Sequence, residues 1–263
     1  MNGIILTILI VGGVGLFVGL FLGIASLKFH VESDPKEQAV LEALPGNNCG
    51  GCGYPGCSGL AAAIAKGEAK VNQCPVGGEA VGKVIAGIMG VEAEDSVRMT
   101  AFVACHGDCE KAGTDYEYHG VEDCTMLSFV PNGGAKSCSF GCLGFGTCVK
   151  ACQFGAIRVE NGIAVVDRDL CKACGKCVDA CPKHLISLIP YDAGYAVACS
   201  SHDKGPAAMK NCEVPCIGCG LCVKACESDA VHVNDFLAVI DQEKCIRCGK
   251  CAEKCQKKAI ANF

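Results

Sequence analysis

Cysteine is the residue that recurs with chemically useful spacing in this chain of 263 residues, which contains 25 cysteines. Three runs, beginning at Cys171, Cys216 and Cys245, have the spacing C-x2-C-x2-C-x3-C, and a fourth run has Phe145 in place of its second cysteine. Thiolates at this spacing hold [4Fe–4S] clusters. The predicted chemistry is therefore one-electron transfer, which needs neither a nucleophile nor a general acid.

The cysteine runs are duplicated at an offset of 74 residues. Cys138, Cys142, Cys148 and Cys152 recur as Cys212, Cys216, Cys222 and Cys226, and Cys171, Cys174, Cys177 and Cys181 recur as Cys245, Cys248, Cys251 and Cys255. Alternating hydrophobic residues around the runs predict short strands, and the Ala- and Lys-containing runs predict short helices. Residues 102–105 also resemble residues 196–199, so each copy is expected to begin with a strand that ends in a cysteine. We expect two pseudo-symmetric βαββαβ units.

Ligand sets follow from the rule that the fourth cysteine of each run binds the other cluster of its pair. The rule predicts three complete sets: Cys216, Cys219, Cys222 and Cys255; Cys245, Cys248, Cys251 and Cys226; and Cys171, Cys174, Cys177 and Cys152. A further set, Cys142, Cys148 and Cys181, lacks a fourth member because Phe145 stands where the second copy has Cys219. Cys138 is the nearest candidate for that ligand.

A separate cysteine module precedes the duplicated region. Cys49, Cys52, Cys57 and Cys74 have the spacing C-x2-C-x4-C-x16-C. The glycines between them let backbone N–H groups turn toward cluster sulfurs. An Ala-rich stretch between Cys57 and Cys74 predicts a helix that returns the fourth ligand. The module is predicted to hold one cluster.

Five cysteines remain outside these sets. They are Cys105, Cys109, Cys124, Cys199 and Cys212. Five [4Fe–4S] clusters are expected, and the count leaves room for a sixth, with Cys105, Cys109 and Cys124 as three of its ligands. The alternative is that these cysteines are small buried hydrophobic residues.

Two other uses of cysteine compete with clusters. Disulfide frameworks belong to secreted proteins, whereas these cysteines lie in tight runs and no cleavable signal is evident, which indicates a reducing compartment. Zinc ribbons also use C-x2-C pairs, but usually as two distant pairs. A zinc-binding scaffold without a redox role remains the alternative from another class.

Composition narrows the function further. The formal net charge of −5 argues against nucleic acid as a partner. The chain has no Trp, 5 Tyr and 34 Gly. Such a chain is expected to draw folding energy from inorganic cores, because metal binding becomes folding energy where no site preforms.

The N-terminal segment predicts a membrane anchor. Residues 4–27 contain no charged side chain and are long enough to span a bilayer as one helix. Lys28 and Lys36 follow the span, so the positive-inside rule places the rest of the chain in the cytoplasm. Ser33, Asp34 and Pro35 then predict the start of a second helix.

The expected fold is α+β with four parts. Residues 1–28 form a transmembrane anchor, 29–95 a connector with the four-cysteine domain, 96–195 a first ferredoxin-like unit and 196–263 a second one. Each ferredoxin-like unit is expected to hold two clusters.

The order of these parts resembles the B subunit of the Rnf complex. The resemblance covers essentially the whole chain, and its most specific part is the stretch LPGNNCGGCGYPGC within 44–74, joined to an N-terminal span. GAKSCSFGCLGFGTCVKACQFGAI and ACSSHDKG are similar to the long form found in anaerobic bacteria. The family implies a single-pass subunit of the bacterial cell membrane, with other membrane subunits and soluble reduced ferredoxin as partners. It implies ferredoxin oxidation, NAD+ reduction and Na+ or H+ pumping, with no flavin or nicotinamide site on this subunit.

A cluster of cations suggests where ferredoxin docks. Lys244, Arg247, Lys250, Lys254, Lys257 and Lys258 crowd the last cysteine run. Because soluble ferredoxins are usually acidic, we expect docking at the C-terminal pair of clusters and electron flow toward the Cys49–Cys74 module. An ordinary solvated face is the alternative. A component of a membrane hydrogenase or formate-oxidising complex is the other redox alternative, but those polyferredoxins normally lack the Cys49–Cys74 module.

Overall fold

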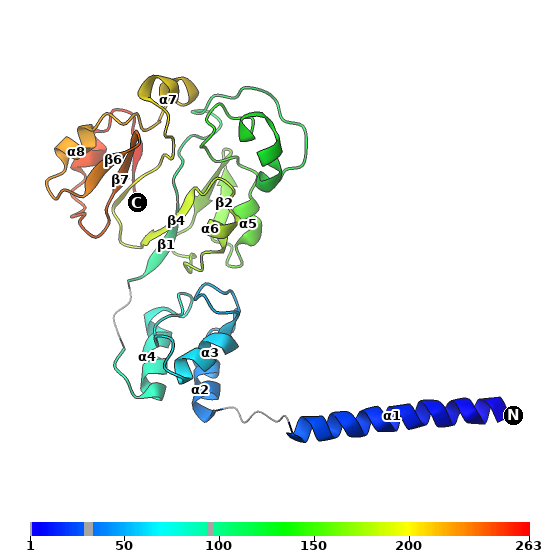
Figure 1. The fold of residues 1–263 in the computed structure, drawn as a ribbon. Helices are drawn as coiled ribbons and strands as arrows, with labels where there is room; N and C mark the ends of the chain where they lie inside the picture. The colour runs from blue at the N-terminus through cyan, green and yellow to red at the C-terminus, as the bar shows by residue number, and fades with distance from the viewer. Residues whose placement is uncertain (1, 29–33, 94–96) are drawn as a thin grey trace.

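The structure is a computed structural model that describes residues 2–28, 34–93 and 97–263, and within the first helix the side chains of Asn2, Ile4, Leu6–Ile8 and Ser26–Lys28 are not described. The predicted domain boundaries at 28/29 and 95/96, and Ser33 of the predicted helix start, lie outside the described residues. The chain runs from a long N-terminal helix through a helical module to two mixed α/β units (Figure 1).

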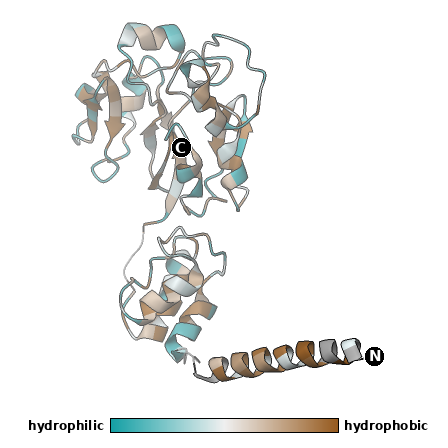
Figure 2. Ribbon diagram, turned by 45° about the vertical axis from the view of Figure 1, so that its right-hand side comes forward, coloured by the Kyte–Doolittle hydropathy of each residue, from teal (hydrophilic) through white to brown (hydrophobic). Residues whose placement is uncertain are grey.

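The first helix, α1, spans Asn2–Lys28. Its described side chains are almost all exposed and apolar, and Figure 2 shows hydrophobic colouring along most of its length. Within the described part of the chain, however, no helix meets the length and hydropathy needed to cross a membrane. The N-terminal span therefore stays a prediction.

Three helices build the four-cysteine module: α2 (Pro35–Ala43), α3 (Cys57–Ala65) and α4 (Gly78–Met89). Asp34 caps α2, since its carboxylate accepts a hydrogen bond from the Lys36 N–H at 2.9 Å. Val40, Leu60 and Ile85 meet in the core and are almost completely buried. The Ala-rich α3 is the helix expected between Cys57 and Cys74.

The first ferredoxin-like unit follows the expected βαββαβ order. Its elements are β1 (Met99–Val103), α5 (Thr147–Ala151), β2 (Ile157–Glu160), β3 (Ile163–Val166), α6 (Lys176–Ala180) and β4 (Ile186–Pro190). The outer strands pair antiparallel with Ala101 opposite Leu188, and β2 and β3 form an antiparallel hairpin. The short helices pack against each other, with the cysteines between them and the strands.

The second unit repeats this order with one additional helix, α7 (Gly205–Asn211), after its first strand. It comprises β5 (Tyr195–Val197), α7, α8 (Leu221–Ala225), β6 (Val231–Asn234), β7 (Leu237–Ile240), α9 (Lys250–Lys254) and β8 (Ile260–Asn262). Again the outer strands pair antiparallel, as do the inner two. The boundary expected between residues 195 and 196 falls inside β5, so Tyr195 belongs with the second unit.

The two units pack side by side through small residues (Figure 1). Ala196, Ala198 and Ala261 meet Phe102 in a small shared core. The ring of Phe263 lies edge-on to that of Phe102, with 5.1 Å between centroids. This apolar contact is modest, which makes other links between the units important.

The first unit carries a segment between β1 and α5 that is longer than its counterpart in the second unit. It includes two 3-10 helices, η1 (Cys124–Phe129) and η2 (Pro131–Gly133). The Cys124 N–H donates to Thr147 Oγ1 at 2.9 Å, which ties η1 to the start of α5. Phe145, the residue in place of a cysteine, packs on Tyr118 of this segment with 5.7 Å between ring centroids.

Candidate metal centres

Four cysteines of the second unit surround one hollow. Cys216, Cys219 and Cys222 lie before and within α8, and Cys255 follows α9. Apolar neighbours such as Val197 and Ile260 complete the lining of this hollow. The structure thus brings together the four side chains that spacing assigns to one set.

A second group in this unit consists of Cys251 and the thiols close enough to affect its pKa. Burial raises the pKa of the Cys251 thiol, and the nearby thiols of Cys245, Cys226 and Cys248 add to the rise. These are again the members of one predicted set. Cys248 is exposed, as is Cys219 of the neighbouring group, whereas Cys251 is buried.

The first unit has an equivalent of the second group. Burial raises the pKa of Cys177 to about 12, with Cys171, Cys174 and Cys152 among the thiols that contribute. Spacing predicts the same set. Ala101 N–H and Ala173 N–H each lie 3.4 Å from the Cys171 sulfur as donors.

The incomplete set of the first unit is completed by a cysteine that spacing did not assign to it. One hollow is lined by Cys142, Cys148, Cys181 and Cys124. Burial raises the pKa of Cys148 to about 11, and the thiols of Cys142, Cys124 and Cys181 contribute. Cys124 therefore stands where Cys138 was expected, because the longer segment of the first unit carries it to the position opposite α5.

Cys138 instead joins a group between the two units. A hollow between them is lined by Cys105, Cys138, Cys199 and Cys212. Cys105 follows β1 and Cys199 follows β5, while Cys138 and Cys212 are equivalent residues that precede the cysteine runs. Each unit thus supplies the same two positions, and the group has the pseudo-symmetry of the duplication. The expected sixth set of Cys105, Cys109 and Cys124 is corrected accordingly, since the structure places these three cysteines apart.

The N-terminal module brings Cys52, Cys57 and Cys74 together. Burial raises the pKa of Cys74, and the thiols of Cys52 and Cys57 add to this rise. Asn48 fixes the loop, since its side-chain oxygen accepts the Cys57 N–H at 2.8 Å. Cys49 lies at the edge of the module and lines an open cleft with Cys174 of the first unit.

Cys109 stands outside these groups. It is exposed, and its N–H donates to the Asn161 carbonyl at 2.9 Å. Across the described residues, no three side chains of His, Cys, Asp or Glu are arranged to hold a single metal ion. Three groups of four cysteines each line one hollow instead.

Backbone N–H groups point at the cysteine sulfurs in both units. Left-handed residues recur at equivalent places: Ala173 and Arg247 with φ 51° and 60°, and His184 and Lys258 with φ 51° and 52°. After His184 and Lys258, the next N–H groups donate to Cys181 at 3.5 Å and to Cys255 at 3.3 Å. Hydrogen bonds to the sulfurs are one determinant of cluster potentials. Four thiols, some of them accepting such hydrogen bonds, form the set that a [4Fe–4S] cluster uses, so the residues present fit this cofactor.

The fold and these sites define an iron–sulfur electron-transfer protein of ferredoxin type. Three family descriptions match parts of it: an Fe-S cluster family at residues 44–76, a 4Fe-4S binding domain at 164–187 and a 4Fe-4S dicluster domain at 215–260.

Relatives along the whole chain define the family. The chain is 45% identical over 245 residues to the B subunit of the Na(+)-translocating ferredoxin:NAD(+) oxidoreductase complex of Acetobacterium woodii, covering 93% of this chain and 73% of the relative. It is 45% identical over 255 residues to the B subunit of the ion-translocating oxidoreductase complex of Methanosarcina acetivorans, covering 97% and 96%. The B subunit of a proton-translocating ferredoxin:NAD(+) oxidoreductase complex from Clostridium ljungdahlii is 41% identical over 244 residues, covering 92% and 86%. The chain belongs to the family of B subunits of ion-translocating oxidoreductase complexes, the Rnf family.

Proposed function

We propose that this chain is the subunit through which electrons enter an ion-translocating ferredoxin:NAD+ oxidoreductase. It takes electrons from reduced ferredoxin and relays them toward NAD+ reduction coupled to Na+ or H+ translocation. The names of the relatives from Acetobacterium woodii and Clostridium ljungdahlii support this activity. Other membrane subunits of the complex are its permanent partners.

Six [4Fe–4S] clusters are proposed, one for each group of four cysteines. When bound, such a cluster takes up and releases one electron. The proposed ligand sets are Cys49, Cys52, Cys57 and Cys74; Cys152, Cys171, Cys174 and Cys177; Cys124, Cys142, Cys148 and Cys181; Cys105, Cys138, Cys199 and Cys212; Cys216, Cys219, Cys222 and Cys255; and Cys226, Cys245, Cys248 and Cys251.

The observation that carries the proposal is that successive groups adjoin, so that the six form one row. At the N-terminal end, burial raises the pKa of Cys174, and Cys49 of the module adds to the rise. Within the first unit, Cys148 likewise adds to the raised pKa of the buried Cys177.

The row continues across the contact between the units. The Cys142 N–H donates to the Cys105 sulfur at 3.4 Å, which joins the first unit to the group between the units. Burial raises the pKa of Cys199 to about 11, and Cys216 of the second unit is a contributing neighbour. The last two groups share the packed helices α8 and α9, each of which carries a cysteine of one group and is followed by one of the other. A row of adjacent sites suits a relay that moves single electrons from one end to the other.

The N-terminal end of the row is proposed to lie at the membrane. Residues 4–27 carry no charged side chain, and α1 covers them as one continuous helix. We infer a single-pass anchor in the bacterial cell membrane with the cysteine groups on the cytoplasmic side. This arrangement puts the Cys49–Cys74 module nearest to the membrane subunits.

The test is to mix the full chain, purified without oxygen in detergent, with reduced ferredoxin and separately with NADH. We expect the brown iron–sulfur absorbance to bleach with ferredoxin and to persist with NADH. Rapid bleaching by NADH alone would contradict the proposed donor. A colourless protein containing zinc would contradict the whole redox assignment.

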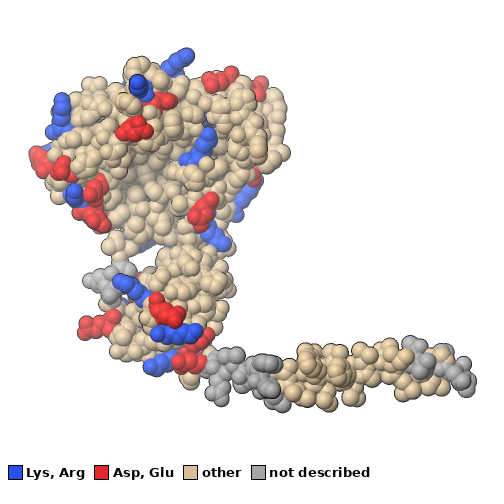
Figure 3. Space-filling model, in the orientation of Figure 1, with Lys and Arg blue, Asp and Glu red and all other residues tan. Residues whose placement is uncertain are grey.

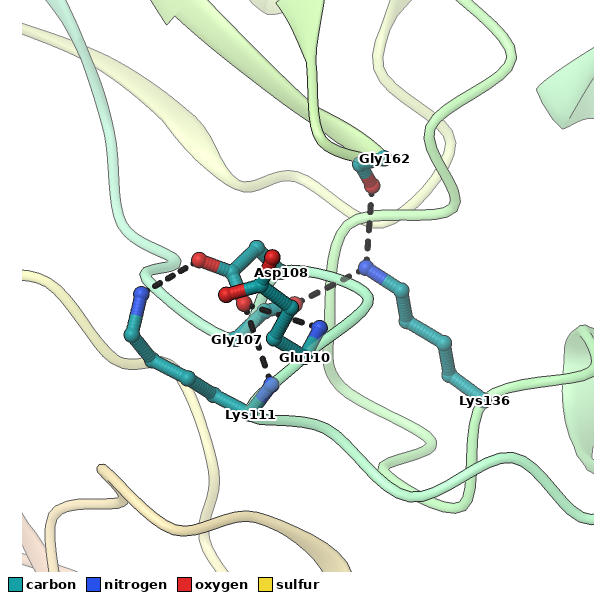
Figure 4. Close-up of polar contacts among 6 residues, drawn as sticks. All are labelled: Gly107, Asp108, Glu110, Lys111, Lys136 and Gly162. Carbon is teal, nitrogen blue, oxygen red and sulfur yellow. Dashed lines mark hydrogen bonds and ion pairs between the residues drawn. The ribbon is translucent and has the colours of Figure 1, made fainter.

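Lys136 offers a test of electrostatic tuning in the middle of the row. Its ammonium donates to the carbonyls of Gly107 at 2.8 Å and Gly162 at 2.9 Å (Figure 4). It lines the hollow between the units, and its charge opposes the burial-driven rise in the pKa of both Cys142 and Cys212. One fixed cation thus acts on two neighbouring groups.

Replacing Lys136 by methionine is expected to lower the reduction potentials of these two clusters, because the ammonium stabilises the extra negative charge of the reduced state. We expect about a tenfold shift in the reduced-to-oxidised ratio, or about 59 mV for a one-electron couple. Redox titration followed by electron paramagnetic resonance measures it. Lys136→Arg keeps the charge and serves as the control. Equal shifts in the two variants would contradict a role for the charge.

A further inference from the structure

The two ends of the row differ in what covers them. The N-terminal module rests on the Cys174 face of the first unit, while the equivalent Cys248 face of the second unit is exposed. Resting on the proposed function, we propose that the Cys248 face is the docking site of the electron donor. The donor is a small iron–sulfur protein that presents its own cluster loop, as the N-terminal module does to Cys174.

The internal contact shows how a cluster loop fits this kind of face. The loop of the module approaches so closely that a Cβ atom on Gly51 would lie 2.6 Å from the Cys174 carbonyl oxygen. Only glycine is tolerated at such an approach, because any side chain would collide with backbone. The contact brings Cys49 next to Cys174. A donor with a small residue beside its cysteines can approach Cys248 in the same way.

Exposure of the cysteines points to the same end of the row. Among the described members of the six groups, Cys219 and Cys248 are the exposed ones, and both belong to the second unit. In the first unit the position of Cys219 is taken by Phe145, which Tyr118 of the longer segment covers. The Cys248 face is therefore the exposed face whose equivalent, the Cys174 face, already contacts a cysteine loop within the chain. It belongs to the last group of the row.

The surface around Cys248 combines an apolar centre with a charged rim. Ile246, between Cys245 and Arg247, is 63% exposed and gives this face an apolar side chain. Arg247 and Lys250 form ion pairs with Asp192 and Glu227, so the cationic cluster is partly neutralised. Lys254 is exposed, and the described ion pairs do not include it.

Charge therefore plays a smaller part in docking than the sequence alone suggests. On the face that Figure 3 shows, charges of both signs are interspersed over the units. The apolar centre and the fit of a glycine-containing loop supply the specificity. In the transfer step one electron leaves the reduced cluster of the donor, which is oxidised, and reduces the cluster held by Cys248 and its group. No bond forms or breaks and no proton moves.

The experiment compares two double variants of the full chain in detergent. Ile246→Glu with Lys254→Glu changes the proposed face without touching a cysteine. Met209→Glu with Lys210→Glu makes matched changes, one apolar and one cationic residue to glutamate, on the exposed side of α7. The probe is a small soluble two-cluster ferredoxin, and the readouts are its binding affinity in the oxidised state and the rate at which its reduced form bleaches each variant.

We expect the Ile246/Lys254 variant to bind ferredoxin at least tenfold more weakly and to be reduced at least tenfold more slowly. Iron content and reduction by dithionite should match the unmodified chain, and the Met209/Lys210 variant should behave like the unmodified chain. Unchanged affinity and rate in the Ile246/Lys254 variant would overturn the docking site while leaving the proposed function intact. If the unmodified chain is reduced by dithionite but neither binds nor oxidises ferredoxin, the proposed function itself fails.

Discussion

Replacing Cys124 by alanine is expected to damage or remove one cluster of the first ferredoxin-like unit. Cys124 lines the same hollow as Cys142, Cys148 and Cys181, and without it only three thiols remain there. A [4Fe–4S] cluster needs four ligands, so the variant should lose between one iron atom and the whole cluster, about four of roughly 24 irons per chain. Iron analysis and electron paramagnetic resonance of the anaerobic protein measure the loss.

Cys109→Ala is the matched control, because Cys109 is exposed and stands outside the six groups. It should retain all of its iron. The double variant Cys124→Ala with Cys138→Ala separates the two assignments of the fourth ligand. If the two cysteines serve different clusters, the double variant loses two clusters. The assignment of Cys124 is wrong if Cys124→Ala keeps its full iron content. It is also wrong if the double variant loses no more iron than Cys138→Ala does alone.

The other cysteine groups show what spacing can predict. The interleaving rule, by which the fourth cysteine of each run binds the other cluster of its pair, works where the members of a set lie within one or two runs. The rule assigns Cys216, Cys219, Cys222 and Cys255 to one set, and the structure places these four cysteines together. The order of strands and helices in each unit was predictable for the same reason, since short strands and helices must flank each run. Local spacing carries this information because each short helix carries one cysteine of one group and is followed directly by a cysteine of the neighbouring group.

Long-range groups lie beyond that rule. Cys124 comes from a segment that has no equivalent in the second unit, and only its chain path shows that it reaches the position opposite α5. The group between the units draws on four separate segments, so no spacing describes it. A usable signal was nevertheless present. Cys105 and Cys199 occupy equivalent positions in the two copies, as do Cys138 and Cys212, and the interleaving rule assigns none of these four cysteines to a cluster.

The basic residues near the C-terminus illustrate a different limit. Their clustering in the sequence is real, yet Lys244, Arg247 and Lys250 each have an acidic partner in the fold. Two of these partners, Asp192 and Glu227, come from distant parts of the chain. The net positive charge of this stretch of the sequence therefore overstates the positive electrostatic potential that a docking protein meets.

The group between the units predicts the second large effect. Cys199→Ala removes one of the four thiols that line this hollow, two of which come from each unit. Apart from this group, the units share a small core of Ala196, Ala198, Ala261 and Phe102 and a few hydrogen bonds, such as that from the His106 N–H to the Ala198 carbonyl. Because metal binding supplies folding energy, the cluster is expected to cross-link the two units. Without it, the units should unfold in two separate thermal transitions rather than one.

Cys226→Ala is the control, because it shows how the loss of a cluster within one unit affects unfolding, as opposed to the loss of the cluster between the units. It also removes a thiol, but from a group that lies wholly within the second unit. Anaerobic calorimetry should show a single, destabilised transition for Cys226→Ala and two transitions for Cys199→Ala. Reduced ferredoxin should bleach only the clusters of the second unit quickly in Cys199→Ala, because the row is broken between the units. A Cys199→Ala protein that keeps its iron, one unfolding transition and full rapid bleaching would place the junction of the relay elsewhere.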